Sequence, residues 1–275
     1  MKLRNNLRGR MKYQSFIPMA IEDYHFDVDA FTLQELESLF KKLNDLVSVL
    51  PEEERMQLIR MEAKDSWQLS EDVPANPFSC VAFFDNENVE NIVRATVYGA
   101  EALEVLPISS RMIRNIHYLI CEGADYDRKY RGEYRKSPIW IGNADKGLKD
   151  ATFVPPVEED MTAAIVNFEN YMNYSDDNVF VKAAVIHYQF EMIHPFIDGN
   201  GRTGRLLNNL FLTENGILKA PVLLLSHVIA RGYNRYCSEL QRVHDTGDII
   251  PWLRYWLKTL SESAKYTLQV LKTNI

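Results

Sequence analysis

Apolar side chains recur at helical spacing along most of this chain, and that periodicity is the feature that most limits its fold. In residues 32–50, apolar positions fall three and four apart behind Thr32 and Glu35, a pair typical of a capped helix start. Pro51 can open the next helix, and Pro74 can end it. Further helices are expected over 89–103, 109–121, 161–174, 178–193, 202–212, 233–244 and 251–271.

Two short β-prone runs interrupt this helical pattern. Residues 137–142 and 152–154 are rich in β-branched and aromatic side chains, and they flank a polar turn that contains Gly147. Pro155 and Pro156 follow at once and stop the second run. We therefore predict an all-α protein with one small β-hairpin and an N-terminal helical extension.

Composition argues against several classes of protein. The formal net charge of −7 argues against a general nucleic-acid binder, which carries a basic surface. Cys80, Cys121 and Cys237 are far apart and in no CxxC pattern, which indicates thiols in a reducing compartment rather than a disulfide framework or a zinc site. No apolar run approaches the roughly 18 residues of a membrane span, and the basic residues 1–14 lack the apolar core of a secretory signal. We expect a cytoplasmic protein that begins with a frayed arm.

The segment His194-Pro-Phe-Ile-Asp-Gly-Asn-Gly-Arg-Thr-Gly-Arg205 combines a base, a carboxylate, three glycines and two arginines. It leads into an expected helix, whose free N–H groups and dipole favour an anion. The glycines let the backbone approach a ligand closely, and Arg202 and Arg205 can fork onto phosphate oxygens. Asp198 supplies a carboxylate for a Mg²⁺ ion that bridges two phosphates. His194 supplies a base, of near-neutral pKa, for an attacking hydroxyl.

Other known ion and nucleotide loops do not fit this segment. An EF-hand that starts at Asp198 would place Arg202 and Asn209 at ligand positions. No Gly-Lys-Ser/Thr follows, as a Walker A loop needs, and no strand precedes, as a dinucleotide fingerprint needs. A lone histidine at a helix end is usually structural, but the whole combination indicates an anion loop with a base.

The segment resembles the signature of Fic family proteins, His-x-Phe-x-Asp-Gly-Asn-Gly-Arg-x-x-Arg, and every defining position is present. The flanks are similar too, at 134–135, 139–142, 154–156, 187–193, 236–243 and 251–252. The resemblance covers roughly residues 87–260, which we take as the Fic core. Residues 1–86 would then form the N-terminal helical extension, with a possible inhibitory helix, and residues 261–275 the end of the C-terminal helix.

The resemblance implies a protein adenylyltransferase, which moves AMP from ATP to a Ser, Thr or Tyr hydroxyl of another protein and releases pyrophosphate. By its place in the motif, His194 would be the base that deprotonates the hydroxyl, and Asp198 would be the Mg²⁺ ligand. Arg202 would contact the β-phosphate and Arg205 the γ-phosphate, while Phe196 would anchor the loop.

Other residues take their expected roles from the same resemblance. The α- and β-phosphates would be held by N–H groups and the Asn amide of Gly199, Asn200 and Gly201. Thr203 and Gly204 complete the nucleotide-binding segment. Tyr236 resembles an aromatic that edges the adenine, although Cys237 stands where many relatives have a second Tyr. A flap that pairs with an extended target segment by strand addition would consist of Ile139, Trp140, Ile141 and Gly142.

Many Fic proteins carry an inhibitory helix with Ser/Thr-x-x-x-Glu, whose Glu pairs with the second motif arginine. Aligned from Glu62-Ala63, this chain has Ser66 at the start, Ser70 at the glutamate position and Glu71 one residue later. On a helix, a shift of one residue turns a side chain by about 100°. Glu71 would therefore reach Arg205 only if the helix is bulged or has ended there. Glu71 is the regulatory candidate, and a solvated acidic side chain is the alternative.

Several functions on this scaffold stay open. The transferred group could be UMP or phosphocholine, or AMP could be removed from a target. A kinase-like variant is disfavoured by the intact Gly199 to Arg202. From another class, the chain could be a nucleotide-sensing regulator without catalysis. The expected partners are ATP and an unidentified protein target, with Mg²⁺ as cofactor; a homodimer is left open, and neither nucleic acid nor a membrane is expected.

The remaining histidines add little from the sequence. His187 lies seven residues before His194, on about the same helix face, and is expected to support the site structurally. No chemistry can be assigned from the sequence to His25, His117, His227 and His244.

Overall fold

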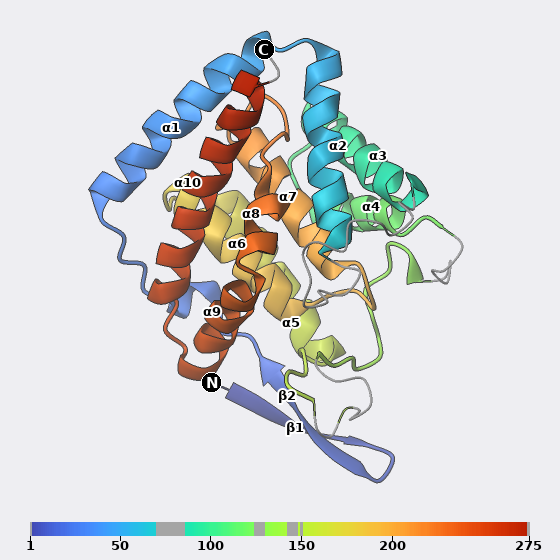
Figure 1. The fold of residues 1–275 in the computed structure, drawn as a ribbon. Coiled ribbons are helices and arrows are strands. Elements are labelled where there is room, and N and C mark those ends of the chain that lie inside the picture. The colour runs from blue at the N-terminus through green and yellow to red at the C-terminus, as the bar shows by residue number, and fades with distance from the viewer. Residues whose placement is uncertain (1, 70–85, 124–129, 142–147, 149–150, 274–275) are drawn as a thin grey trace.

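The computed structural model describes residues 2–69, 86–123, 130–141, 148 and 151–273. These residues form ten α-helices, one 3-10 helix and one two-stranded sheet (Figure 1). In chain order the helices are η1 (Ile21–Asp23), α1 (Ala30–Val49), α2 (Glu52–Gln68), α3 (Asn86–Leu103), α4 (Ser110–Ile120), α5 (Glu158–Tyr174), α6 (Val179–Ile193), α7 (Asn200–Glu214), α8 (Leu225–Arg231), α9 (Tyr233–Thr246) and α10 (Ile250–Thr273). The expected all-α fold with one small hairpin is confirmed.

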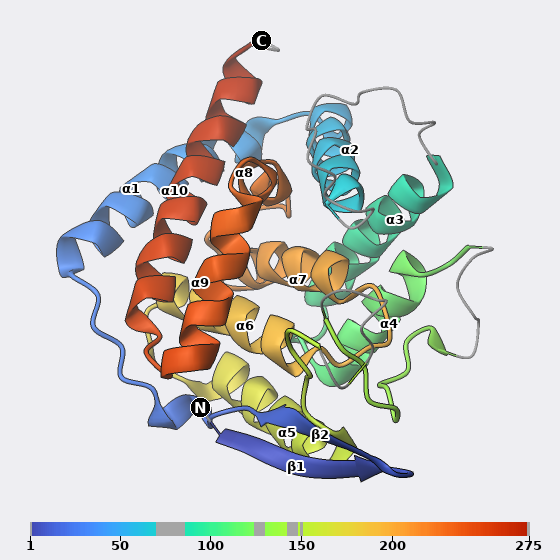
Figure 2. The same ribbon diagram turned by 60° about the horizontal axis from the view of Figure 1, so that its bottom comes forward.

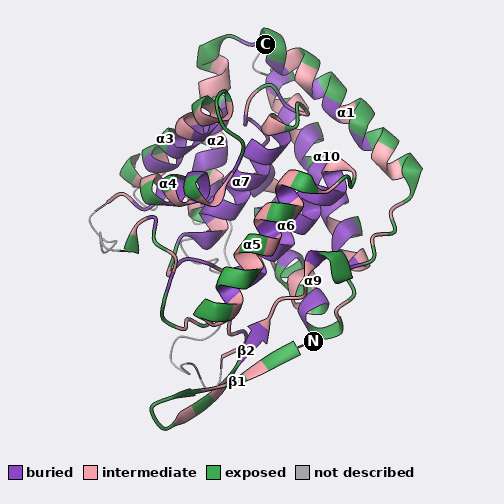
Figure 3. Ribbon diagram, turned by 180° about the vertical axis from the view of Figure 1, so that it is seen from behind, coloured by how far each residue is buried: buried purple, intermediate pink, exposed green. Residues whose placement is uncertain are grey.

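Helices α6 and α7 pack against each other at the centre of the fold (Figure 1). On one side α5 and α10 cover α6, and on the other α2, α3 and α4 contact α7. Because α6 is apolar around most of its circumference, nearly all of its residues are buried (Figure 3). The connection between these two central helices is the segment from His194 to Gly199.

Most helices lie where the periodicity predicts them, within a few residues at each end. Helix α1 begins earlier than expected, because Asp29 rather than Thr32 caps it: the Asp29 carboxylate accepts from Thr32 N at 2.8 Å. Pro51 precedes α2 as predicted. The short helix α8 was not predicted.

The N-terminus forms a hairpin, so the expectation of a frayed arm was wrong. Strand β1 (Lys2–Arg8) pairs antiparallel with β2 (Met11–Ile17), and Gly9 makes the turn at a φ of 62°. Long-range contacts hold this hairpin along α5 (Figure 2). Arg4 lies 2.8 Å from Glu159 and 3.0 Å from Asp160, both in the first turn of α5. Phe16 is buried.

The hairpin predicted over 137–142 and 152–154 takes a smaller form in the described residues, which exclude Gly142. Ile141 and Phe153 make one isolated antiparallel bridge, with Ile141 N donating to Phe153 O at 2.8 Å and Phe153 N to Ile141 O at 3.1 Å. Phe16 N donates to Val154 O at 2.9 Å, and the Phe16 and Phe153 rings lie 5.7 Å apart. Strand β2 therefore supports the flap segment along one side.

The three parts expected from the sequence share a single hydrophobic core. Leu43 of α1, Ile186 of α6 and Leu271 of α10 belong to the same buried cluster. Trp252 ties α10 to α6, because its Nε1 donates to Ala184 O at 2.8 Å. Within the described ranges, none of the helices combines the length and apolarity that a membrane crossing requires.

Candidate active site

Helix α6 ends in an unusual backbone conformation at His194. This residue has a φ of 48° and a ψ of 61°, and it is the one non-glycine with a left-handed φ among the described residues. That conformation costs about 1–2 kcal/mol for a residue with a side chain, so other contacts must hold it. His194 N donates to Phe190 O at 2.9 Å, and Arg135 Nε donates to His194 O at 2.8 Å. The turn directs the chain from α6 into α7.

The His194 ring is oriented as a base requires. Its Nδ1 lies 3.2 Å from the Glu191 carbonyl oxygen, which can only accept, so Nδ1 carries the proton and Nε2 keeps its lone pair. Burial, with a smaller contribution from Arg135, lowers the pKa of His194 to about 4, whereas the sequence predicted a pKa near neutral. The ring is therefore unprotonated near neutral pH. A bound polyphosphate would raise this pKa, because a nearby anion favours the imidazolium.

The loop after His194 is closed by the side chain of Asn200. Asn200 Oδ1 accepts from Phe196 N at 2.8 Å, and its Nδ2 donates to Phe196 O at 3.0 Å. The amide that was expected to contact phosphates is thus engaged with the loop backbone. Any phosphate contact from Asn200 would come from its backbone N–H, in the first turn of α7. The expected burial of Phe196 is confirmed, because the side chain is fully buried.

Two glycines are required by close packing around the loop. Gly199 precedes α7 at a φ of 77°, and a Cβ there would lie 2.8 Å from Cys121 Sγ. A Cβ on Gly204 would lie 2.7 Å from Glu191 Oε1, where α7 crosses α6. Thr203 between them is buried and hydrogen-bonds the Gly199 carbonyl through both N and Oγ1, at 3.0 and 2.9 Å. The start of α7 is therefore rigidly placed.

Arg202 lies at the start of α7 with an unused donor. Its guanidinium is 3.1 Å from Asp198 Oδ2 and 4.9 Å from the ring centre of Trp67. The side chain is almost fully buried, yet within the described part of the chain its Nε has no hydrogen-bond partner. A buried cationic donor without a partner is suited to binding an anion.

Arg205 is held by the last turn of α2. Its Nε donates to Ser66 Oγ at 3.0 Å, and an Nη donates to Ser66 O at 2.8 Å. The carboxylates of Glu62 and Glu191 lie close enough to act on its charge. Glu71, the predicted regulatory residue, lies outside the described residues. In the described part of the chain, Ser66 of α2 contacts Arg205, and Trp67 contacts Arg202.

Asp198 is the candidate metal ligand. Its carboxylate is largely exposed and pairs with Arg202. Among the residues that the structure describes, no three or more His, Cys, Asp or Glu side chains cluster as a metal site would require. This donor set suits Mg²⁺ with a nucleotide, because proteins often bind that ion through one or two carboxylates and the phosphates of the substrate.

Two residues that contact the loop were missed from the sequence. Arg135 is buried and donates to the carbonyls of His194, Ile193 and Pro156, at 2.8, 3.2 and 2.7 Å. His117 of α4 hydrogen-bonds the Asp198 carbonyl and stacks on Phe196. The only signal at Arg135 was its place in a family-like flank, and His117 had none.

The other predicted residues lie around the loop at greater distance. Trp140 and Ile141 are exposed on the flap segment, and Ile139 is half-buried. Tyr236 is buried, and its hydroxyl lies 2.9 Å from Nε2 of His187, whose structural role stays a prediction. An adenine contact by Tyr236 stays a prediction.

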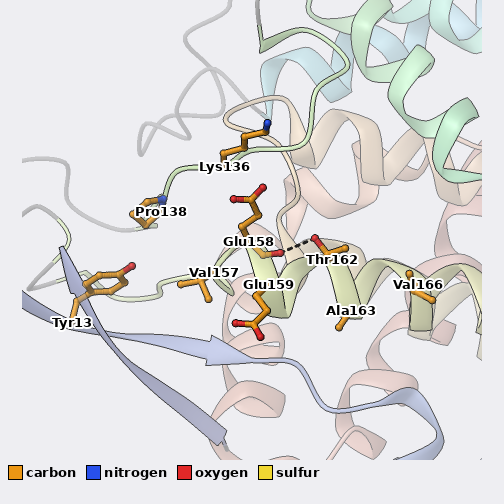
Figure 4. A pocket seen from close by; sticks show the side chains of 9 residues that line it. All are labelled: Tyr13, Lys136, Pro138, Val157, Glu158, Glu159, Thr162, Ala163 and Val166. Carbon is orange, nitrogen blue, oxygen red and sulfur yellow. Dashed lines mark hydrogen bonds between the residues drawn. The ribbon is translucent and has the colours of Figure 1, made fainter.

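An open cleft of about 770 Å³ lies between β2, residues 136–138 and the start of α5. It is bounded by Tyr13 of β2, by Lys136 and Pro138, and by the first turns of α5 (Figure 4). None of the residues from His194 to Arg205 lines it. The cleft instead adjoins the flap segment, because Pro138 in its lining directly precedes Ile139.

Known proteins with a similar sequence include a matching family and several of its named members. Residues 107–212 match the Fic/DOC family. The chain is 36% identical over 127 residues to a protein adenylyltransferase Fic of Aedes aegypti, covering 45% of this chain and 22% of that protein. It is 30% identical over 160 residues to the Drosophila grimshawi protein of the same name, covering 57% and 29%. The chain thus spans less than a third of these relatives.

Solved structures share the fold at low sequence identity. A Fic family protein from Desulfovibrio desulfuricans superposes with a TM-score of 0.66 at 18% identity, over 90% of this chain and 77% of that one. A Fic domain containing signaling protein from Bacteroides thetaiotaomicron gives a TM-score of 0.64 at 19% identity, over 88% and 97%. Residues 107–212 thus match the Fic/DOC family, and the chain as a whole is similar in fold to solved Fic proteins.

Proposed function

We propose that this chain is a protein adenylyltransferase, which transfers AMP from ATP to a hydroxyl side chain of a target protein. The observation that carries the proposal is the His194 ring, whose Nδ1–H is committed to Glu191 O while Nε2 keeps its lone pair. This base ends α6 six residues before α7 begins, and the N-terminus of α7 and Arg202 favour a phosphate. The relatives that bear the name protein adenylyltransferase support AMP as the transferred group.

In the proposed reaction, the target hydroxyl attacks the α-phosphorus of ATP. His194 Nε2 takes the hydroxyl proton as the new oxygen–phosphorus bond forms. The bond between the α-phosphorus and the bridging oxygen breaks, and pyrophosphate leaves with that electron pair. Because phosphoryl chemistry of this kind needs little covalent help, the protein acts mainly by placing the reactants and stabilising charge.

The charges on the nucleotide would be held by residues of the loop. Backbone N–H groups of Gly199 to Gly201 would bind the α- and β-phosphates, and the guanidiniums of Arg202 and Arg205 the β- and γ-phosphates. Asp198 would hold Mg²⁺, which neutralises phosphate charge when bound. Thr203 and Gly204 keep the helix start in place, as their close contacts indicate.

The protein target would lie along the flap segment. The exposed Trp140 and Ile141 offer apolar contact and a strand edge, and the adjoining cleft at Tyr13 and Lys136 leaves room for the continuing segment (Figure 4). Backbone pairing with the flap would bring the target hydroxyl to the site without recognising a long sequence motif in the target.

We further propose that α2 restrains the nucleotide site. Ser66 occupies two donors of Arg205, and Trp67 covers Arg202, so both arginines are engaged before a nucleotide arrives. Glu71 follows this turn and stays the candidate for an inhibitory carboxylate. The proposed division into an extension, residues 1–86, and a Fic core, residues 87–260, places this restraint in the extension.

Intact-mass measurement after incubation with ATP and Mg²⁺ tests the proposal. We expect the Glu71→Gly variant to gain the mass of one or more AMP groups on itself faster than the unchanged chain, and His194→Ala to gain none. An unchanged rate for Glu71→Gly would remove Glu71 as the inhibitor. Nucleotide binding without any adduct, even for Glu71→Gly, would favour a nucleotide-sensing regulator.

A further inference from the structure

His117 is a buried histidine outside the signature motif, in the last turn of α4. It lies 77 positions before His194, where the loop begins, and the reaction proposed above does not use it. Its ring nevertheless contacts three residues of the loop: it stacks on Phe196, hydrogen-bonds the Asp198 carbonyl and lies beside Gly199. A side chain with that set of contacts can determine the shape of the loop.

The hydrogen bonds of His117 determine which nitrogen carries its proton. Gly132 N donates to His117 Nδ1 at 2.9 Å, so Nδ1 must be the unprotonated acceptor. In the neutral ring the proton then belongs to Nε2, which lies 2.9 Å from the Asp198 carbonyl oxygen. The ring therefore donates to Asp198 and accepts from Gly132.

Stacking and packing restrict the ring further. The His117 and Phe196 rings are 3.6 Å apart and nearly parallel, at 4°. Cys121 Sγ, one turn along α4, lies 3.3 Å from the same Nε2. Gly132 is held in turn, because its carbonyl accepts from Arg114 Nε at 2.7 Å. With both neighbours in place, the ring cannot rotate without losing a hydrogen bond.

We propose that His117 is a positioning residue of the nucleotide site: its Nε2–H holds the Asp198 peptide and so directs the Asp198 carboxylate toward the metal position. This role rests on the proposed function, in which Asp198 carries Mg²⁺ with the nucleotide. Groups that orient a metal ligand without touching the metal are often worth tenfold or more in metal affinity. His117 reaches its ligand residue through the backbone rather than through the carboxylate.

Three substitutions separate the contacts of the ring. His117→Phe keeps an aromatic ring for the stack on Phe196 and removes both hydrogen bonds. In His117→Gln, the amide nitrogen falls close to the place of Nε2 and can still donate to Asp198 O. In His117→Asn, the shorter amide falls close to Nδ1 and can serve only Gly132. The control is His244→Phe, which alters a buried histidine beside Phe16 and Phe153, away from the loop.

The experiment is a calorimetric titration of ATP into the full chain and each variant, across a Mg²⁺ series and in EDTA, with thermal unfolding to verify folding. We expect the Mg²⁺ concentration at half-maximal ATP binding to rise about tenfold in His117→Phe and His117→Asn, and about threefold or less in His117→Gln. Affinity for ATP in EDTA should stay within about twofold, because metal-free binding depends on the arginines and the start of α7. His244→Phe should leave the Mg²⁺ dependence unchanged.

Three results would overturn the inference. One is an equal loss of ATP binding with Mg²⁺ and in EDTA, which would mean general collapse of the loop. Another is an Asn variant that performs as well as the Gln variant, which would mean that the Gly132 contact matters rather than the Asp198 contact. The third is a ring ¹⁵N spectrum of the unliganded chain with the proton on Nδ1 of His117. That spectrum needs no nucleotide, so it judges the contact even if the chain binds no ATP and the proposed function fails.

Discussion

Gly199 connects the loop to α7, and its substitution by alanine tests how tightly the site is packed. Two costs add at this position. The φ of 77° is left-handed, which costs a residue with a side chain about 1–2 kcal/mol. The new Cβ would also lie 2.8 Å from Cys121 Sγ and 3.2 Å from His117 Nε2, and overpacking of this kind costs about 1–3 kcal/mol. We predict that Gly199→Ala lowers the free energy of unfolding by about 2–5 kcal/mol.

Gly216 offers a matched control for the free-energy cost of the left-handed backbone. It has a similar φ of 70°, but a Cβ there would meet nothing within 4 Å. Gly216→Ala should therefore cost only the left-handed strain, about 1–2 kcal/mol, less a few tenths gained from a stiffer unfolded chain. The assay is urea unfolding at equilibrium, with the same slope required for both variants. If Gly199→Ala costs no more than Gly216→Ala, the packing argument is wrong.

A double-mutant cycle identifies the clashing atom. Cys121→Ala removes the sulfur that the new Cβ would meet, so the cost of Gly199→Ala should be smaller in that background. We expect a coupling of about 1 kcal/mol or more, which is in the range for residues in direct contact. Strict additivity would mean that Cys121 is not the obstacle, and that strain or His117 accounts for the cost.

Three further predictions follow from other contacts. Trp67→Ala should raise ATP affinity two- to fivefold, because it removes a cation–π contact with Arg202 worth about 0.5–1 kcal/mol. Binding of a fluorescent ATP analogue measures this change, and a fall in affinity would contradict the restraint by α2. Burial lowers the pKa of His187 from 6.5 to about 3, so His187 binds fewer protons in the folded state than in the unfolded state. Its contribution to stability is therefore complete above pH 6.5 and is lost as the pH falls through about 3. The difference in unfolding free energy between the unchanged chain and His187→Phe should shrink from neutral to acid pH, and a constant difference would refute the assignment. Phe16→Ala removes the ring that packs on Phe153 and should lower the free energy of unfolding by about 3–4 kcal/mol. ATP binding measured by calorimetry should not change. A loss of ATP affinity would show that the N-terminal hairpin affects more than the flap.

Most of the helical architecture could be predicted from the sequence. The periodicity of α1, α5 and α10 is long and regular, so their existence and approximate ends follow from which positions must be buried. Helix α8 has only seven residues, too few for a periodic signal. The N-terminal hairpin was missed because its strands are mostly polar. Its stability comes from Phe16 against Phe153 and from Arg4 on α5, contacts that join distant parts of the chain.

The motif of the candidate site could be predicted, but its surroundings could not. His194 to Arg205 are contiguous, and their spacing alone indicates an anion loop with a base. Arg135 and His117 act on the backbone of that loop from far away in the sequence, and a single residue without a pattern gives no signal. Asn200 shows the opposite difficulty: its residue type suggested a phosphate ligand, while its side chain closes the loop.

Labelled ATP distinguishes which group of the nucleotide is transferred to protein. Purified Glu71→Gly protein is incubated with Mg²⁺ and with ATP labelled either at the α-phosphate or at the γ-phosphate, and protein-bound label is counted. We predict that the α-label becomes covalently attached, that the γ-label does not, and that His194→Ala in the same background attaches neither. Covalent γ-label, or α-label at an undiminished rate in His194→Ala, would contradict AMP transfer with His194 as the base.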